Sequence, residues 1–140
     1  MKKIKRSKFI LILIIAVLLC PLKTTICPNW KIKIVNNQGI PIAGRFARQS
    51  WKDYSTEFGG SENLDDAWTD QAGYVEFPER ASFKCLLVRV LIPVVKIVTF
   101  QFHSSNKPVA EITSWDKSSN PVSARYEKGK NLQEIITLEN

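Results

Sequence analysis

The sequence predicts a mainly β protein, an antiparallel β-sandwich with one short helix around residues 82–92. Two observations carry this prediction. Short segments in which apolar and polar side chains alternate recur along the chain, which is the pattern of half-buried strands. Turn-forming residues separate these segments, as in sandwiches built from many short strands. The chain has 140 residues, enough for a single domain, which we expect over residues 30–140.

The N-terminus has the composition of a targeting segment. The first eight residues carry five cations and no carboxylate, and an uncharged apolar run follows from Phe9 to Leu19. This order is typical of a secretory signal. We therefore expect residues 1–22 to be a signal peptide or membrane anchor, with a short linker over residues 23–29. A lipoprotein signal modified at Cys20 is a further alternative, although Leu19 is larger than the residue a lipoprotein signal peptidase prefers.

These features predict export to the periplasm or cell envelope, or anchoring at the membrane. Contact with the membrane is expected only through the N-terminal segment, if that segment is not cleaved. The net charge of +7 also depends on this segment, because 15 basic and 13 acidic residues remain without its five cations. Nucleic-acid binding requires clustered Lys and Arg on the folded part. The cluster of Lys128 and Lys130 beside Glu127 is too short, so no nucleic-acid partner is expected.

The first strands are the clearest. Residues 30–35 alternate, with Trp30, Ile32 and Ile34 on one face. The segment 36–39 is rich in residues that tolerate positive φ and predicts a turn. A second strand is expected over residues 45–51.

A long loop, or a loop with a short irregular strand, is expected over residues 52–66, which contain two glycines and no sustained period. The stretch from Thr69 to Arg80 then predicts a β-hairpin. Its turn is expected over residues 70–73, since Asp at the first position and Gly at the last favour a type I turn. Pro78 ends the second strand of this hairpin, because proline lacks the donor that a ladder requires.

The segment 81–102 is apolar nearly throughout. Its β-branched residues favour strands, whereas its length and Ser82 favour a buried helix up to Pro93, followed by a strand. The segments 108–116 and 132–140 alternate and predict strands. A further short strand is expected over residues 122–126.

Two turn motifs carry a resemblance to a known family. The first is Gly39, Pro41 and Gly44 before the second strand, and the second is a Thr-Asp-x-x-Gly-Tyr element at Thr69, Asp70, Gly73 and Tyr74. In this order they resemble the carboxypeptidase-regulatory-like or transthyretin-like (prealbumin-type) domain, over about residues 31–80. The segments "RQSWKDYS" and "FPER" are also similar to a group of small exported bacterial proteins with no assigned activity. The resemblance implies a fold and says little about function.

Three cysteines fit an exported chain. Loss or acylation of Cys20 would leave Cys27 and Cys85, which we expect as a candidate disulfide. The alternative is two unpaired thiols, one near the start of the mature chain and one buried.

The strongest candidate for a functional surface is a group of aromatic and acidic side chains around the segment 50–70. Aromatic faces beside carboxylates can hold a sugar ring or a peptide, and Tyr and Trp are common interface anchors. The alternative is that Trp51 and Trp68 fill the core and only Tyr54 reaches solvent. The candidate binding residues are Trp51, Tyr54, Asp65, Asp66, Trp68 and Trp115.

A metal site or a catalytic site has weaker support in the sequence than a binding surface. Calcium is an alternative for the acidic residues Asp53, Glu57, Glu62, Asp65, Asp66 and Asp70, whose oxygens could serve as ligands. Their spacing is not that of an EF-hand loop, so solvated carboxylates are the default. His103 is the single histidine, in a Ser/Asn-rich turn, and is expected to be polar surface.

The sequence therefore predicts an exported, non-catalytic β-sandwich module without a cofactor. It would act by binding or structural contact at the cell envelope, with a protein or carbohydrate partner. One alternative is an envelope hydrolase or metal-dependent enzyme that uses the loop 50–70. Another is a membrane-anchored protein that protects against a toxin or stabilises a membrane complex.

Overall fold

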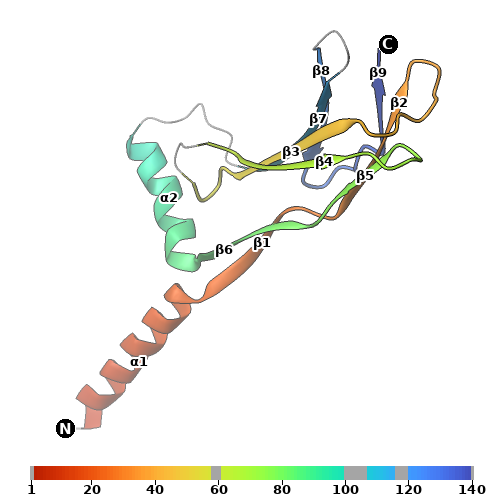
Figure 1. The fold of residues 1–140 in the computed structure, drawn as a ribbon. Coiled ribbons are helices and arrows are strands. Elements are labelled where there is room, and N and C mark those ends of the chain that lie inside the picture. Colours follow the sequence, from red (N-terminus) through yellow and green to blue (C-terminus); the bar gives the residue numbers. More distant parts are fainter. Residues whose placement is uncertain (1, 58–60, 100–106, 116–119, 140) are drawn as a thin grey trace.

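The computed structural model describes residues 2–57, 61–99, 107–115 and 120–139, and the side chains from residue 7 onward within these ranges. Two helices and nine strands lie in these residues (Figure 1). In chain order they are α1 (Lys2–Leu19), β1 (Pro21–Cys27), β2 (Trp30–Asn36), β3 (Phe46–Asp53), β4 (Asn63–Trp68), β5 (Tyr74–Phe77), β6 (Arg80–Cys85), α2 (Leu86–Val98), β7 (Pro108–Trp115), β8 (Pro121–Glu127) and β9 (Ile135–Leu138).

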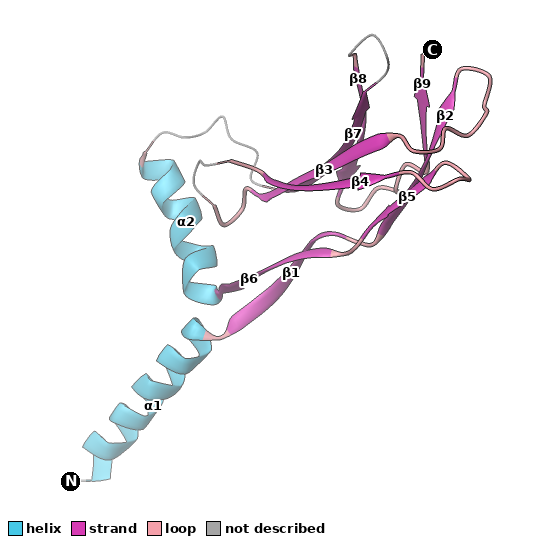
Figure 2. Ribbon diagram, viewed as in Figure 1, coloured by secondary structure: helices cyan, strands magenta, loops and turns pink. Residues whose placement is uncertain are grey.

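The strands form three sheets, with the orders β5-β2-β9, β4-β3-β7-β8 and β1-β6. Most neighbouring strands are antiparallel, but β2 and β9 run parallel, which the alternation of side chains did not indicate. Figure 2 shows the β1-β6 ribbon running from the other strands to the two helices, with α1 projecting beyond it. The protein is thus mainly β with several antiparallel pairings, consistent with a β-sandwich.

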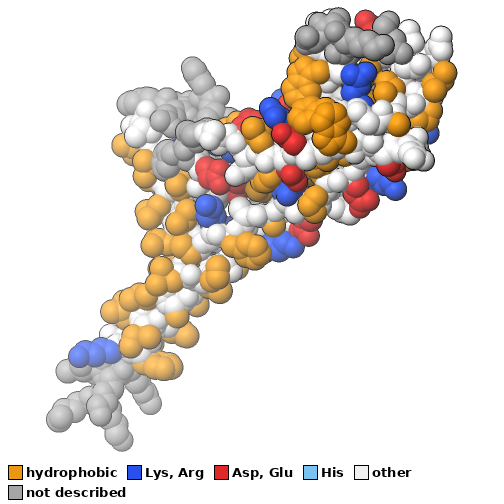
Figure 3. All heavy atoms as spheres, viewed as in Figure 1, with side chains coloured by type: hydrophobic (Ala, Val, Ile, Leu, Met, Phe, Trp, Pro, Cys, Tyr) orange, Lys and Arg blue, Asp and Glu red, His pale blue; other side chains and the backbone are white. Residues whose placement is uncertain are grey.

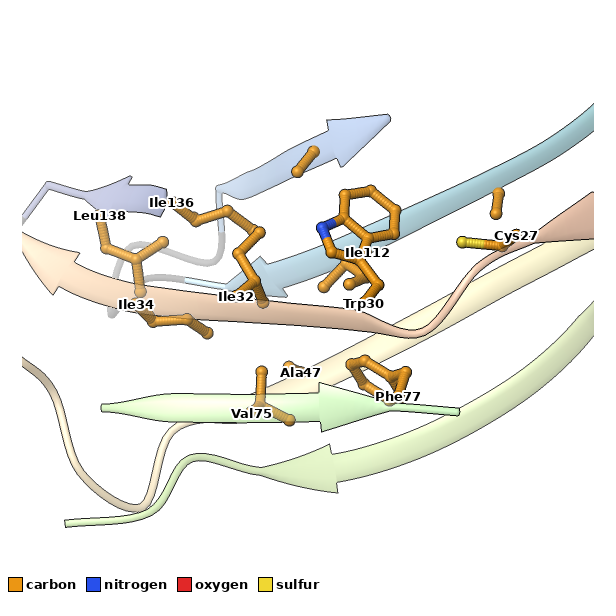
Figure 4. Close-up of a cluster of buried hydrophobic side chains, with 12 residues drawn as sticks. Cys27, Trp30, Ile32, Ile34, Ala47, Val75, Phe77, Ile112, Ile136 and Leu138 are labelled. Carbon is orange, nitrogen blue, oxygen red and sulfur yellow. The ribbon is translucent and has the colours of Figure 1, made fainter. Parts of the chain in front are cut away.

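The core lies between the three-stranded and the four-stranded sheet (Figure 4). Trp30, Ile32 and Ile34 of β2 are fully buried, as their period of two predicts. The indole nitrogen of Trp30 donates a hydrogen bond to the carbonyl of Gln133, 2.7 Å away. The other sheet closes this core mainly with small residues, since its buried positions include Ala47, Ala110, Ile112 and Ala124.

The turn predicted over residues 70–73 is confirmed. The amide of Gly73 donates to the carbonyl of Asp70, and the Asp70 carboxylate accepts from the amides of Ala72 and Tyr74. The hairpin prediction is wrong, however. The strand before the turn, β4, pairs with β3, whereas the strand after it, β5, pairs with β2. The turn therefore carries the chain from one sheet to another.

The predictions for the linker and for the helix need correction. Residues 23–27, expected within a linker over residues 23–29, belong to strand β1, which pairs with β6 from Pro21 opposite Cys85 to Cys27 opposite Arg80. The predicted helix around residues 82–92 begins only at Leu86, because residues 80–85 are held in this ladder. It continues through Pro93 to Val98, so no strand follows Pro93 directly.

The remaining strand predictions agree with the structure at β2, β3, β7, β8 and β9, within a few residues at their ends. The expected loop over residues 52–66 is shorter than predicted. Strand β3 extends to Asp53 and β4 begins at Asn63, so Asp65 and Asp66 are strand residues. Neither helix among the described residues is both long enough and apolar enough to cross a membrane. His103 lies outside the described residues.

Candidate functional site

The outer face of the four-stranded sheet carries a row of three aromatic rings from three neighbouring strands. The ring of Phe46 on β3 lies 5.2 Å from that of Trp68 on β4, at an interplanar angle of 66°. On its other side it lies 5.5 Å from the ring of Trp115 on β7, at 33°. Trp68 is 66% exposed, which makes it the most open ring of the row and contradicts the alternative in which it fills the core.

Strand register explains why these rings meet. Phe46 is paired with Trp68, and the pairing of Ala47 with Ser114 sets Phe46 opposite Trp115. Side chains at directly opposed positions project from the same face of a sheet. Two hydrogen bonds hold the row in place. The Ser114 hydroxyl donates to the Phe46 carbonyl at 2.8 Å, and Arg45 Nη1 donates to the Trp115 carbonyl at 3.1 Å.

An ion pair adjoins the rings. Arg48 Nε lies 2.6 Å from Asp66 Oδ1, and Arg48 Nη2 lies 2.8 Å from Asp66 Oδ2, a bidentate geometry. The guanidinium also stands 5.4 Å from the Phe46 ring and 5.9 Å from the Trp115 ring. The hydrogen bond from Arg48 lowers the pKa of Asp66, and the same bond raises the pKa of Arg48. Both groups therefore stay charged together across the physiological range. We call Phe46, Arg48, Asp66, Trp68 and Trp115 the aromatic platform.

Hydroxyl groups extend the polar part of this face. Thr113 of β7 is paired with Arg48, and Ser123 of β8 is paired with Thr113, which sets both on the platform side. Together these positions offer apolar faces beside donors and acceptors. That combination suits a ligand with one apolar side and several polar groups at its edge.

Trp51 and Asp65 were predicted for the same surface, but they lie on the opposite face of the sheet, where they meet Arg80 of β6. The Arg80 guanidinium stands 4.2 Å from the centre of the Trp51 ring. Arg80 Nε donates to Gln49 Oε1 at 2.7 Å, and Nη2 pairs with Asp65. Sequence reasoning missed Arg80, because its partners come from separate segments of the chain. Its role is to fasten the β1-β6 ribbon to the four-stranded sheet.

Tyr54 is separate from both groups. It follows the end of β3, and its hydroxyl donates to Glu62 at 3.1 Å. The Lys52 ammonium stands 5.1 Å from its ring. The carbonyl of Tyr54 accepts a hydrogen bond from Lys96 of α2. Of the six predicted binding residues, the structure thus unites three, namely Asp66, Trp68 and Trp115.

Of the six acidic residues considered as calcium ligands, Asp53 is the one that is fully buried. Its carboxylate accepts from the hydroxyls of Ser55, Thr56 and Ser82, the last two at 2.8 and 2.7 Å. Burial alone would raise the pKa of Asp53, but these hydrogen bonds outweigh burial and lower it. Within the described ranges, no three His, Cys, Asp or Glu side chains converge as metal ligands.

The cysteine pairing is contradicted. All three cysteines lie within the described residues and are free thiols. Cys27 and Cys85 stand at opposite ends of the β1-β6 ladder, since Cys27 is paired with Arg80. The five residue steps from Arg80 to Cys85 span about 16 Å along a strand, whereas a disulfide needs Cα atoms within about 7 Å. Burial raises the pKa of Cys27 to about 11, although Arg80 opposes this.

No known protein family matches this sequence, and neither a characterised protein nor a solved structure is significantly similar to it.

Proposed function

We propose that this chain is an exported, non-enzymatic β module that binds a carbohydrate at the cell envelope through the aromatic platform. One observation carries the proposal: three rings in a row, with an exposed indole at one end and a bidentate ion pair beside them. A pyranose ring has an apolar face of C–H groups and an edge of hydroxyls. The C–H face fits the electron-rich face of an aromatic ring. The hydroxyl edge would reach Arg48 and Asp66, whose side chains are 39% and 44% exposed.

The geometry also argues against a hydrolase that uses Asp65 and Asp66 as its pair of carboxyl groups. Glycoside cleavage requires two carboxyl groups that face one cleft. Asp65 and Asp66 are adjacent in strand β4, so they project from opposite faces of the sheet. Asp65 is paired with Arg80 and Asp66 with Arg48, and each carboxylate serves a different contact.

The finer fold assignment belongs to the same proposal. We place the module with the carboxypeptidase-regulatory-like or transthyretin-like domains. Supporting this placement, the two turn motifs that carry the resemblance pack against each other, with Gly73 beside Pro41. A domain of that kind would serve as a rigid support for a binding face, since its motifs build turns and no reaction centre.

The test is a titration with a chitooligosaccharide, monitored by tryptophan fluorescence. We expect a saturable change in emission, and Trp68→Ala should weaken binding by about tenfold or more, which corresponds to 1.4 kcal/mol. Tyr74→Ala is the matched control. Tyr74 is another exposed aromatic residue on a strand, but it lies beside Lys31 and Lys33 and away from the platform. Equal binding by both variants, or no saturable change with any sugar, contradicts the proposal.

A further inference from the structure

Helix α2 exposes its apolar side chains and turns its two cations toward the rest of the protein. Seven of its 13 residues are large aliphatics exposed by 37 to 69%, and they are Leu87, Val90, Leu91, Val94, Val95, Ile97 and Val98. Soluble proteins rarely leave such a continuous apolar surface in contact with water. A helix of this kind needs a partner on its outer side.

The two cations of α2 are turned toward the protein. Lys96 is only 5% exposed, and its ammonium donates to the carbonyl of Tyr54. Arg89 donates to the carbonyl of Leu22 at 2.6 Å. The helix contains no acidic residue. These contacts attach α2 to the β strands by its polar groups, so its outward face is left without a charge.

The apolar surface continues from α2 onto α1. The pairing of Pro21 with Cys85 brings the end of α1 beside the start of α2, because Cys20 precedes Pro21 and Leu86 follows Cys85. The two helices contact each other at this point. Leu22 and Phe83 on the connecting ribbon are also exposed, Phe83 by 64%. Figure 3 shows the hydrophobic side chains along both helices on the visible face.

The chemistry of α1 indicates what covers this surface. An uncharged apolar run follows five cations, with no acidic residue among the first 19 positions. Cations at the end of an apolar helix attract anionic lipid headgroups. Because the ladder joins the start of α2 to the end of α1, α2 meets any bilayer that α1 enters. A helix of 13 residues is about 20 Å long, short of the hydrocarbon core, so α2 would lie in the interface.

We propose that α2, with Leu22 and Phe83, is an interfacial membrane anchor that lies in the headgroup region of an anionic bilayer beside α1. This extends membrane contact beyond the N-terminal segment and does not depend on sugar binding at the platform. Retention of α1 on the chain is part of the proposal, since the apolar surface of α2 is continuous with it.

The test uses the full chain and vesicles of phosphatidylethanolamine and phosphatidylglycerol with brominated acyl chains. Bromine quenches only indoles that enter the bilayer. Val94→Trp should add emission that is quenched and shifted to the blue by these vesicles. Ile40→Trp is the matched control, since Ile40 is 55% exposed in the turn after β2. Its introduced indole should show no quenching. Absence of quenching for both variants overturns the proposal.

A second variant measures affinity. Val94→Asp with Ile97→Asp should weaken vesicle binding of the full chain by about tenfold or more, because charges replace two exposed aliphatic side chains that would contact the bilayer. Unchanged circular dichroism confirms folding of the variant, and unchanged vesicle affinity overturns the proposal. A second copy of the chain is the rival occupant. Dimerisation without lipid in sedimentation, together with a blue-shifted Val94→Trp indole before vesicles are added, also overturns it.

Discussion

Gly73 packs so closely on Pro41 that a β-carbon on the glycine would stand 2.8 Å from the β-carbon of the proline. It would also stand 2.9 Å from the carbonyl oxygen of Ile34, which is backbone and cannot move aside easily. The two turns therefore meet at a point where only hydrogen fits. This contact joins the turn between β4 and β5 to the turn that follows β2.

Replacement of Gly73 by alanine should consequently be severe. The φ of +77° already disfavours a side chain, and the contact with Pro41 and Ile34 adds to this strain. We expect Gly73→Ala to lower the free energy of unfolding by about 3 kcal/mol or more in urea titrations. Gly39→Ala is the control, because Gly39 has φ +79° and open space around it. It should cost only about 1 kcal/mol. Equal costs for the two variants would show that the close contact is unimportant.

Arg80 should matter more than any ion pair on the surface. Arg80→Met keeps the stem over Trp51 but leaves Gln49 and Asp65 without the guanidinium. We expect a loss of about 2 kcal/mol in the free energy of unfolding. The exposed pair of Lys23 and Glu79 provides the comparison, and Glu79→Gln should lower the free energy of unfolding less than Arg80→Met does. A larger loss for Glu79→Gln than for Arg80→Met would contradict the proposed role of Arg80.

Asp53 should make the fold sensitive to acid. Its pKa is lowered in the folded state, so its contribution to stability is present above the unfolded pKa of about 3.9 and is lost as pH falls through the folded value. Asp53→Asn should therefore be less stable than the wild type at pH 6. Urea titrations at decreasing pH should show this difference shrinking below about pH 4. A difference that stays constant down to pH 2 would assign the effect to packing.

Cys27 should make the stability of the fold decrease at alkaline pH. Its pKa rises from 9.0 to about 11 on folding, so the unfolded chain loses the thiol proton first. Stability should then fall between these values by at most about 1.4 kcal/mol per pH unit. Cys27→Ala should remove this part of the pH dependence.

Iodoacetamide at neutral pH should alkylate the exposed Cys20 and spare Cys27 until the chain unfolds. Rapid alkylation of Cys27 in the folded protein would contradict its burial.

The local pattern of the sequence predicts strands well and their partners poorly. The alternation of Trp30, Ile32 and Ile34 predicts both β2 and the residues that it buries. The residues around Asp70 likewise predict their turn. The pairing of the flanking strands with different sheets depends on contacts far along the chain, which no local pattern contains. The disulfide prediction was wrong for this reason, because the register of β1 and β6 separates Cys27 from Cys85.

Helix α2 and the aromatic platform show two other limits of prediction from the sequence. Pro93 argues for a helix end, yet α2 continues to Val98, where Lys96 is held by the carbonyl of Tyr54. A tertiary contact thus outweighs a local preference. For the platform, Trp68 and Trp115 could be singled out by residue type. Phe46 and Arg48 could not, since only the register of β3 with its two neighbours places them in the same row.

The parallel pairing of β2 with β9 has a consequence for biogenesis. Trp30 depends on a carbonyl 103 residues further on, and Ile136 and Leu138 supply fully buried side chains beside β2. A chain still emerging from a ribosome or a translocation channel lacks this last strand, and one edge of β2 stays open. Closure of so distant a contact is slow compared with helix formation. The core around β2 is therefore completed only after β9, the last strand, has been synthesised.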